Sequence, residues 1–145
     1  MPYPEYLVAP MRQELVDLSA KECRTPEAVE AVLKSPGVVM MVVNSVCGCA
    51  AAKARPGVGM ALGHPNRPDV VATVFAGADI TATDRARQYF TGFAPSSPSI
   101  ALLRDGKLLY MMERRDIESK SAEMIAAQLT LAFDKFCTPA AAVTH

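Results

Sequence analysis

The sequence lacks a surplus of charge of either sign, because 15 lysines and arginines balance 15 aspartates and glutamates among its 145 residues. A protein that binds nucleic acid usually carries an excess of basic side chains, so we expect neither a nucleic-acid partner nor an acidic partner surface. Long apolar runs are absent too, and the longest falls far short of the about 20 residues that cross a bilayer. We therefore expect no membrane partner.

A secretory signal is also missing, because Pro2 and Pro4 stand where a basic start and an apolar stretch would begin. We therefore expect a cytoplasmic protein. Cysteines number only four, and in a reducing compartment closely spaced cysteines indicate redox or metal chemistry more often than structural disulfides. With 50% apolar residues and no internal repeat, the sequence predicts a single domain over residues 1–137 and a flexible tail over residues 138–145.

The feature around which the rest of the chain is arranged is the triplet Cys47-Gly48-Cys49. It follows an apolar run, residues 38–44, that predicts a buried strand, and it precedes residues 50–53, which predict the first turns of a helix. A cysteine at a helix start ionises more easily, because the first N–H groups have no intrahelical partner and the helix dipole favours an anion. Lys53 and Arg55 are candidate cations that would favour the thiolate further.

The spacing of the two cysteines restricts the disulfide that they can form. Residues two apart on a regular helix lie about 200° apart, on opposite faces, so Cys47 and Cys49 could not be bridged if both stayed helical. A bond between them needs irregular backbone, which Gly48 permits by tolerating positive φ. We predict a strained disulfide that is readily reduced and suits transient exchange better than stabilisation of the fold.

Three interpretations of the cysteine pair are open. The two side chains could simply be small buried hydrophobes, or they could be metal ligands. Zinc usually takes four ligands, and the other candidate ligands, Cys23, Cys137, His64 and His145, include no second closely spaced pair. We expect Cys23 and Cys137 to be structural or incidental.

The redox interpretation is favoured, with Cys47 at the turn as the attacking thiolate and Cys49, one turn further in, as the resolving thiol.

Hydrophobic periodicity and turn residues predict an N-terminal helix followed by the order β-α-β-α-β-α-β-β-α. This order predicts an α/β fold, a thioredoxin-like three-layer α/β/α sandwich whose mixed sheet ends in an antiparallel hairpin at Asp105-Gly106. We expect Pro10 to start or kink the first helix, and Pro56 to kink or break the helix that follows the cysteines. The predicted strands are residues 21–24, 38–44, 69–75, 99–104 and 107–112. The predicted helices end near residues 18, 34, 62, 92 and 136. The predicted N-caps are Thr25 for the second of these helices, Asp79 or Thr81 for the fourth, and Ser119 or Ser121 for the last.

Three stretches together resemble the bacilliredoxins, thioredoxin-like proteins of bacteria that make the small thiol bacillithiol. They are residues 10–15 (PMRQEL), residues 44–51 (NSVCGCAA) and residues 90–99 (FTGFAPSSPS), and the resemblance covers roughly residues 3–137. It implies that Cys47 takes bacillithiol from an S-bacillithiolated protein, and that Cys49 or a second bacillithiol then releases it.

The resemblance also implies the partners of this reaction. The chain itself would bind no cofactor and no metal, bacillithiol would be the thiol co-substrate, and reduction would come ultimately from a flavin-dependent NADPH reductase upstream. A general protein disulfide isomerase or reductase would use the same cysteines on other substrates. Two alternatives from other classes stay open: a metal or metal-cluster carrier that uses Cys47 and Cys49 in a dimer, and a thioredoxin-like binding module without enzymatic activity.

A second site element lies before the strand at residues 99–104. Thioredoxin-like folds carry a cis-proline there that faces the active cysteine, and Pro98 is the matching position. The backbone of Ser97 would then face the sulfur of Cys47 and hydrogen-bond an extended substrate. Asn44 and Ser45 are predicted to orient the turn or cap the helix through side-chain to backbone bonds. The predicted substrate-binding residues are Asn44, Ser45, Gly48, Ser97 and Pro98.

Overall fold

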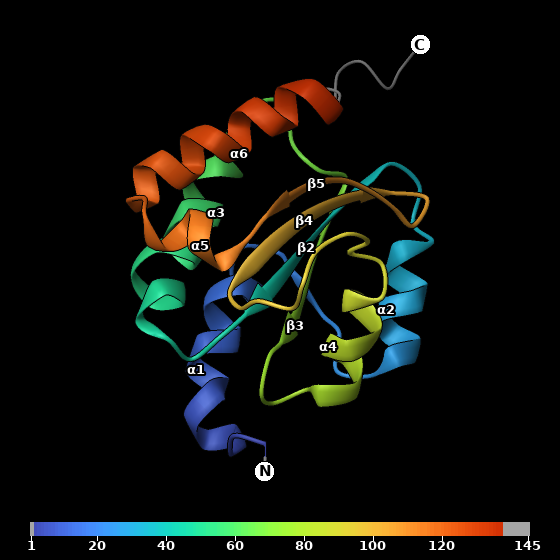
Figure 1. The fold of residues 1–145 in the computed structure, drawn as a ribbon, viewed down its shortest axis with the longest axis vertical. Helices are drawn as coiled ribbons and strands as arrows, with labels where there is room; N and C mark the ends of the chain where they lie inside the picture. Colours follow the sequence, from blue (N-terminus) through green and yellow to red (C-terminus); the bar gives the residue numbers. More distant parts are fainter. Residues whose placement is uncertain (1, 138–145) are drawn as a thin grey trace.

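The structure is a computed structural model that describes residues 2–137, and it contains a five-stranded sheet with helices on both faces (Figure 1). In spatial order the strands are β1 (Lys21–Glu22), β3 (Val70–Phe75), β2 (Val38–Asn44), β4 (Ser99–Arg104) and β5 (Lys107–Met112). The strands β1, β2 and β3 are parallel, whereas β4 is antiparallel to β2 and β5 is antiparallel to β4. This is the predicted mixed sheet with its antiparallel hairpin.

Strand β2 lies at the centre of the sheet, and all seven of its residues are buried. Successive side chains of a strand point to opposite faces, so Val38, Met40 and Val42 belong to one hydrophobic cluster and the residues between them to the other. An apolar run without alternation is typical of a strand covered on both faces, which explains why residues 38–44 carry no polar side chain before Asn44.

Two layers of helices cover the sheet. On one face lie α1 (Glu5–Val16), α3 (Arg55–Ala61), α5 (Arg114–Glu118) and α6 (Ala122–Phe136); on the other lie α2 (Pro26–Leu33) and α4 (Ile80–Arg87). Helices α3 and α6 approach closely at Gly57, where an added Cβ would lie 2.7 Å from the Cγ2 atom of Ile125. Glycine at this position therefore lets the helix that follows the cysteines pack against the last helix.

Local signals account for the starts of α2 and α6 and for the turn between β4 and β5. The hydroxyl of Thr25 accepts a hydrogen bond from the N–H of Ala28, and the hydroxyl of Ser121 accepts one from the N–H of Met124, so both residues cap helices. Ser121, not Ser119, is thus the cap of α6. Asp105 and Gly106 both have positive φ, 52° and 73°, as a tight hairpin turn requires.

Several predictions need correction. Pro10 lies inside α1, which begins five residues earlier, so it does not start that helix. The polar connection before the last helix, for which no helix was predicted, contains α5 (Arg114–Glu118). Asp79 stands at the N-cap of α4 without a side-chain cap bond, because both of its oxygens accept hydrogen bonds from Arg12 at 2.6 and 2.8 Å. Helix α4 also ends at Arg87, short of the predicted residue 92, and the predicted tail lies outside the described residues.

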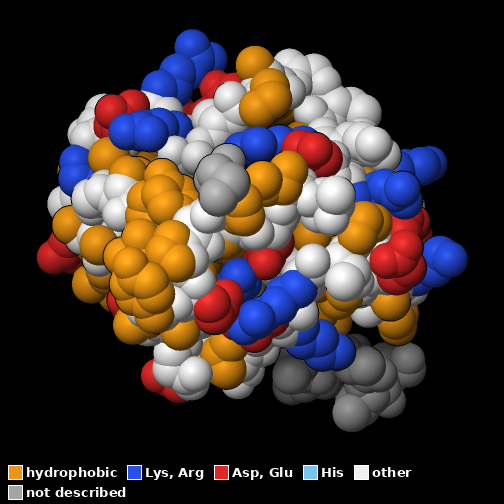
Figure 2. All heavy atoms as spheres, turned by 90° about the horizontal axis from the view of Figure 1, so that it is seen from below, with side chains coloured by type: hydrophobic (Ala, Val, Ile, Leu, Met, Phe, Trp, Pro, Cys, Tyr) orange, Lys and Arg blue, Asp and Glu red, His pale blue; other side chains and the backbone are white. Residues whose placement is uncertain are grey.

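No helix among residues 2–137 is long and apolar enough to cross a bilayer. Figure 2 shows the face of the molecule seen from below, where Lys and Arg side chains are interspersed with Asp and Glu side chains. Hydrophobic side chains gather on one side of this face. Basic and acidic side chains are therefore not only equal in number in the sequence but also mixed on this face of the molecule.

Candidate active site

The cysteine triplet lies where the sequence predicted it, between a buried strand and a helix. Strand β2 ends at Asn44, the chain bends, and helical structure begins at Gly48. The carbonyl oxygen of Cys47 accepts hydrogen bonds from the N–H groups of Ala50 and Ala51 at 3.1 and 3.3 Å, so Cys47 stands at the start of the helix. All four cysteines are free thiols in this structure, and the strained disulfide stays a prediction.

The helix after the cysteines is not broken at Pro56, so of the two expected outcomes, a kink or a break, the break does not occur. It continues into α3 through a π-helical turn, η1 (Ala50–Ala54), in which the N–H of Arg55 bonds to the carbonyl of Ala50, five residues back. A proline inside a helix lacks a donor and its ring clashes with the carbonyl four residues earlier. The wider turn accommodates both effects, so helical structure continues from η1 into α3 without interruption.

Cys47 is half-buried, and its pKa lies below the ordinary value for a thiol. Burial alone opposes ionisation, but it is outweighed by the hydroxyl of Ser45, by the N–H groups of Ala50 and Cys49, and by the positive charge of Arg114. A lowered pKa increases the fraction of thiolate at neutral pH, which is the reactive form. The turn therefore supplies the electrostatic setting that thiol-disulfide exchange needs.

The prediction of which cations act on Cys47 was wrong. Lys53 donates from Nζ to the carbonyl of Glu118, and Arg55 is buried with an exposed fraction of 3%. Neither residue contributes to the lowered pKa of Cys47, whereas Arg114, which sequence reasoning did not single out, does. Its position could not be inferred from the sequence, because it lies more than sixty positions after Cys47 and approaches only through the fold.

The residues after Cys47 leave the surface of the turn open. Gly48 is exposed, its φ is not positive, and an added Cβ would meet nothing within 4 Å. In the thiol form the backbone therefore does not use the conformational freedom expected of Gly48. Cys49 is half-buried in the first helical turn and packs against the core cluster on the α3 and α6 side.

The predicted proline element lies at the same end of the sheet. Val43 pairs with Ser99, so the residues that follow β2 and the residues that precede β4 lie at the same end of the sheet. The peptide bond between Ser97 and Pro98 is cis, as the resemblance implied. The Nη1 atom of Arg114 donates to the carbonyl of Ser97 at 3.3 Å, which links this loop to the cation that acts on Cys47. An open groove of about 460 Å³ adjoins it, lined by residues 94–96, residues 113–115 and Glu118.

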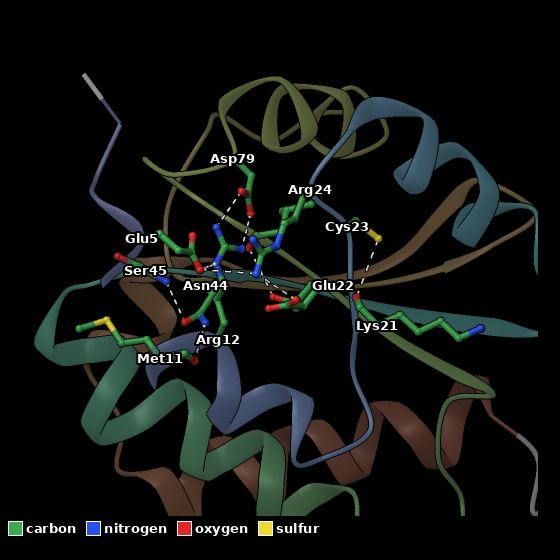
Figure 3. A network of polar contacts seen from close by, with 12 residues as sticks. Glu5, Met11, Arg12, Lys21, Glu22, Cys23, Arg24, Asn44, Ser45 and Asp79 are labelled. Carbon is green, nitrogen blue, oxygen red and sulfur yellow. Dashed lines mark hydrogen bonds and ion pairs between the residues drawn. The ribbon is translucent and has the colours of Figure 1, made fainter. Parts of the chain in front are cut away.

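Asn44 and Ser45 form a buried network beneath the turn (Figure 3). The amide of Asn44 donates to the carbonyl of Met11 at 3.1 Å and accepts from the N–H of Ser45 at 2.9 Å. The hydroxyl of Ser45 accepts from the N–H of Cys47 at 3.3 Å. Both residues thus orient the turn; Asn44 is 2% exposed, and a contact between either residue and a substrate stays a prediction.

Cys23, Cys137 and His64 are held in other surroundings than the triplet, and His145 lies outside the described residues. Cys23 and Cys137 are buried, and burial raises the pKa of each thiol to about 11, which keeps both protonated and unreactive. His64 pairs through Nε2 with Asp134 at 2.7 Å on the surface. Among residues 2–137 no three histidine, cysteine, aspartate or glutamate side chains are gathered so that they could hold a metal ion.

Comparison with known proteins places the chain in a family. The family model described as "Disulphide isomerase" matches residues 3–137. A bacilliredoxin of Koribacter versatilis is 54% identical over 136 residues, which cover 93% of this chain and 94% of that protein. The chain belongs to the bacilliredoxin family. Another bacilliredoxin, of Cytophaga hutchinsonii, is 52% identical over 133 residues and covers 92% of this chain and 98% of that protein.

Solved structures place this bacilliredoxin among proteins of thioredoxin fold. A protein described as an oxidoreductase with a thioredoxin fold superposes with a TM-score of 0.62 over 78% of this chain and 92% of that one, at 14% identity. Thioredoxin of Malassezia sympodialis gives a TM-score of 0.55 over 81% of this chain and 90% of that one, also at 14% identity. The predicted fold is therefore confirmed, and the family identifies the chain as a thiol-disulfide oxidoreductase.

Proposed function

We propose that this protein removes bacillithiol from S-bacillithiolated proteins, with Cys47 as nucleophile and Cys49 as resolving thiol. The proposal rests on the position of Cys47, which is half-buried, stands at the start of a helix and has a lowered pKa. Cys47 also lies at the end of the sheet at which Pro98 precedes β4. Relatives of closely similar length and about half-identical sequence are named bacilliredoxins.

The first step is a thiol-disulfide exchange. The thiolate of Cys47 attacks the bacillithiol sulfur of the mixed disulfide, so the bond between that sulfur and the substrate cysteine breaks as the Cys47 bond forms. The substrate leaves as a thiolate, which takes a proton from solvent. In the second step the thiolate of Cys49 attacks Cys47, which forms the intramolecular disulfide and releases bacillithiol as a thiolate. Alternatively the thiolate of a second bacillithiol attacks the bacillithiol sulfur bound to Cys47. The bond to Cys47 then breaks, Cys47 is released as a thiolate, and the two bacillithiol molecules leave as bacillithiol disulfide.

We infer a substrate subsite from the open face of the turn and the loop opposite. Gly48 leaves room beside the sulfur of Cys47, and the backbone of Ser97 next to Pro98 supplies polar groups for the chain that flanks the disulfide. Bacillithiol would be co-substrate, a flavin-dependent NADPH reductase would regenerate it, and the protein would act in the cytoplasm. In this mechanism the electrons pass through sulfur alone, and the chain holds no cofactor of its own.

A general disulfide isomerase or reductase is the second candidate. The description of the family model, "Disulphide isomerase", favours it, because the name concerns disulfides and does not mention a small thiol. Both candidate functions require the same two cysteines and the same residues at this end of the sheet. They differ only in which disulfide is attacked fastest.

Intact-mass analysis of Cys49→Ser after incubation with a bacillithiolated protein separates the candidates. Without the resolving thiol, the adduct is expected to accumulate on Cys47 as one bacillithiol per chain. The variant Cys47→Ser is the matched control and is expected to acquire no adduct. If the adduct stays on the substrate while ordinary protein disulfides are attacked readily, the isomerase or reductase is the correct function. If Cys49→Ser reacts with neither, both candidates fail.

A further inference from the structure

Beneath the cysteine turn lies a buried arginine that the function proposed above does not use. The guanidinium of Arg55 donates from Nη1 to the Oδ1 atom of Asn44 at 2.9 Å and to the carbonyl of Ser45 at 3.0 Å. Its Nε atom donates to Glu14 on α1 at 3.0 Å. A buried cation is costly unless its hydrogen bonds are satisfied, and three acceptors from two other segments satisfy this one.

These bonds fix the backbone of Ser45 from both sides. The N–H of Ser45 donates to Asn44 Oδ1, and its carbonyl accepts from Arg55, which also holds Asn44 Oδ1 in place. The hydroxyl of Ser45 then accepts from the N–H of Cys47, so its own proton is left to donate to the sulfur. Any rotation of the Ser45 backbone would carry this hydroxyl away from Cys47.

We propose that Arg55 is a positioning residue that sets the reactivity of Cys47 by fixing Ser45, and that the π-helical turn η1 is what aims Arg55 at Ser45. The inference rests on the proposed function, in which Cys47 is the nucleophile. It assigns a role in the reaction to a residue that touches neither the substrate nor the reacting sulfur.

The π-helical turn explains the direction of the Arg55 side chain. One residue of an α-helix corresponds to a rotation of about 100°, so the extra residue of a π-helical turn rotates everything after it by about that angle. Without the turn Ala50–Ala54, the side chain of Arg55 would be rotated by about 100° around the helix axis from the direction in which it now reaches Asn44 and Ser45.

Charge alone does not account for the arrangement. The cation that favours the thiolate of Cys47 directly is Arg114 on α5, while Lys53 is bonded to the carbonyl of Glu118. The charge of Arg55, which forms an ion pair with Glu14, is not among the causes that lower the pKa of Cys47. The contribution of Arg55 must therefore pass through the geometry of Ser45, and that distinction can be tested.

The test measures the iodoacetamide alkylation rate of Cys47 against pH in a Cys49→Ser background, where the two buried thiols do not compete. The variants are Arg55→Met, Ser45→Ala, and the two combined. At a pH below the pKa of Cys47, each single variant is expected to react about tenfold more slowly, because one unit of pKa is a tenfold change in thiolate. The double variant is expected to react no more slowly than the slower single variant, since both changes remove the same bond.

Three further variants control for charge and for folding. Glu14→Gln keeps an acceptor for Arg55 and removes a charge, so no change in rate is expected. Arg55→Lys keeps the charge without the fork of donors, so a rate between those of wild type and Arg55→Met is expected. Arg12→Met removes another buried arginine that has no bond to Ser45, and it should destabilise the fold without a change in the pH profile of Cys47.

The outcomes separate this inference from the proposed function. If Arg55→Met reacts like wild type, or if the two single effects multiply in the double variant, Arg55 does not act through Ser45 and the inference is wrong. If Arg55→Met does not fold, the comparison of Arg55→Lys with Glu14→Gln decides, and equal rates for these two overturn the inference. If wild-type Cys47 itself titrates at about 8.5 like a free thiol, the proposed function loses its basis whatever Arg55 does.

Discussion

The guanidinium of Arg114 donates a hydrogen bond to the carbonyl of Ser97, with 3.3 Å between Nη1 and oxygen, and the same cation favours the thiolate of Cys47. One side chain thus connects the loop that carries Pro98 with the sulfur at the start of the helix. Arg114 is partly exposed and also pairs with Glu118 at 3.6 Å. Its influence on Cys47 is therefore electrostatic and open to screening by salt.

Replacement of Arg114 by methionine is expected to raise the pKa of Cys47 and to slow its alkylation by a few-fold at neutral pH. The effect should be modest because a partly exposed charge is screened by water. It should shrink further at about 1 M salt in the wild-type protein, where charges interact over only about 3 Å. Alkylation rates against pH at low and high salt measure both effects. Equal pH profiles for Arg114→Met and wild type would contradict this role.

The buried thiols predict a loss of stability at alkaline pH. Cys23 and Cys137 have pKa values of about 11 in the folded protein, against about 8.5 in an unfolded chain. Between these values the unfolded state releases protons that the folded state keeps, so stability is complete below about pH 8.5 and is lost as pH rises toward 11. By about pH 11 the loss should reach about 3 kcal/mol per thiol, because one pKa unit corresponds to about 1.4 kcal/mol. Urea unfolding from about pH 8 to about pH 11 measures it.

The variant Cys23→Ala with Cys137→Ala supplies the control for the alkaline effect. Its unfolding midpoint should fall less steeply over the same pH range, because the remaining decline comes from other groups. An equally steep fall in the double variant would show that the two thiols are not responsible.

The buried ion pair between Arg12 and Asp79 should contribute strongly to stability (Figure 3). Asp79→Asn leaves the charge of Arg12 buried with only a partly exposed Glu5 beside it, at 3.2 Å. Removing one partner of a buried pair typically costs about 3–5 kcal/mol, and Glu5 should reduce this to about 2–4 kcal/mol. Urea unfolding gives the value, and iodoacetamide alkylation of Cys47 should be unchanged. A loss below about 1 kcal/mol would mean that the introduced amide and Glu5 together replace the lost carboxylate.

The N-cap of α6 gives a prediction with a close control. Ser121→Ala removes the acceptor for the N–H of Met124 and is expected to destabilise the protein by about 1 kcal/mol. Ser119→Ala, two residues earlier, removes only a hydroxyl that donates to the carbonyl of Asp116 and should cost less. Thermal unfolding of the two variants side by side checks the difference. Equal destabilisation would contradict the assignment of the cap.

The strands at residues 38–44, 99–104 and 107–112 could be predicted with their boundaries because their signals are local. An uninterrupted apolar run and an Asp-Gly turn act over a few residues and do not depend on the rest of the fold. Other features could not be predicted, because they depend on partners. Asp79 carries the chemistry of a helix cap, yet Arg12 takes both of its oxygens, and the short helix α5 has too few residues for a periodic signal.

The sequence by itself determined that a cysteine stands between a buried strand and a helix start, and that Pro98 precedes a strand. Only the tertiary structure decided which charged groups act there. Arg55 reaches Glu14 across 41 positions of sequence, and Arg114 reaches Ser97 across 17. Long side chains find their partners only after helices and strands have packed, so spacing along the chain predicts the nucleophile but not the groups that tune it.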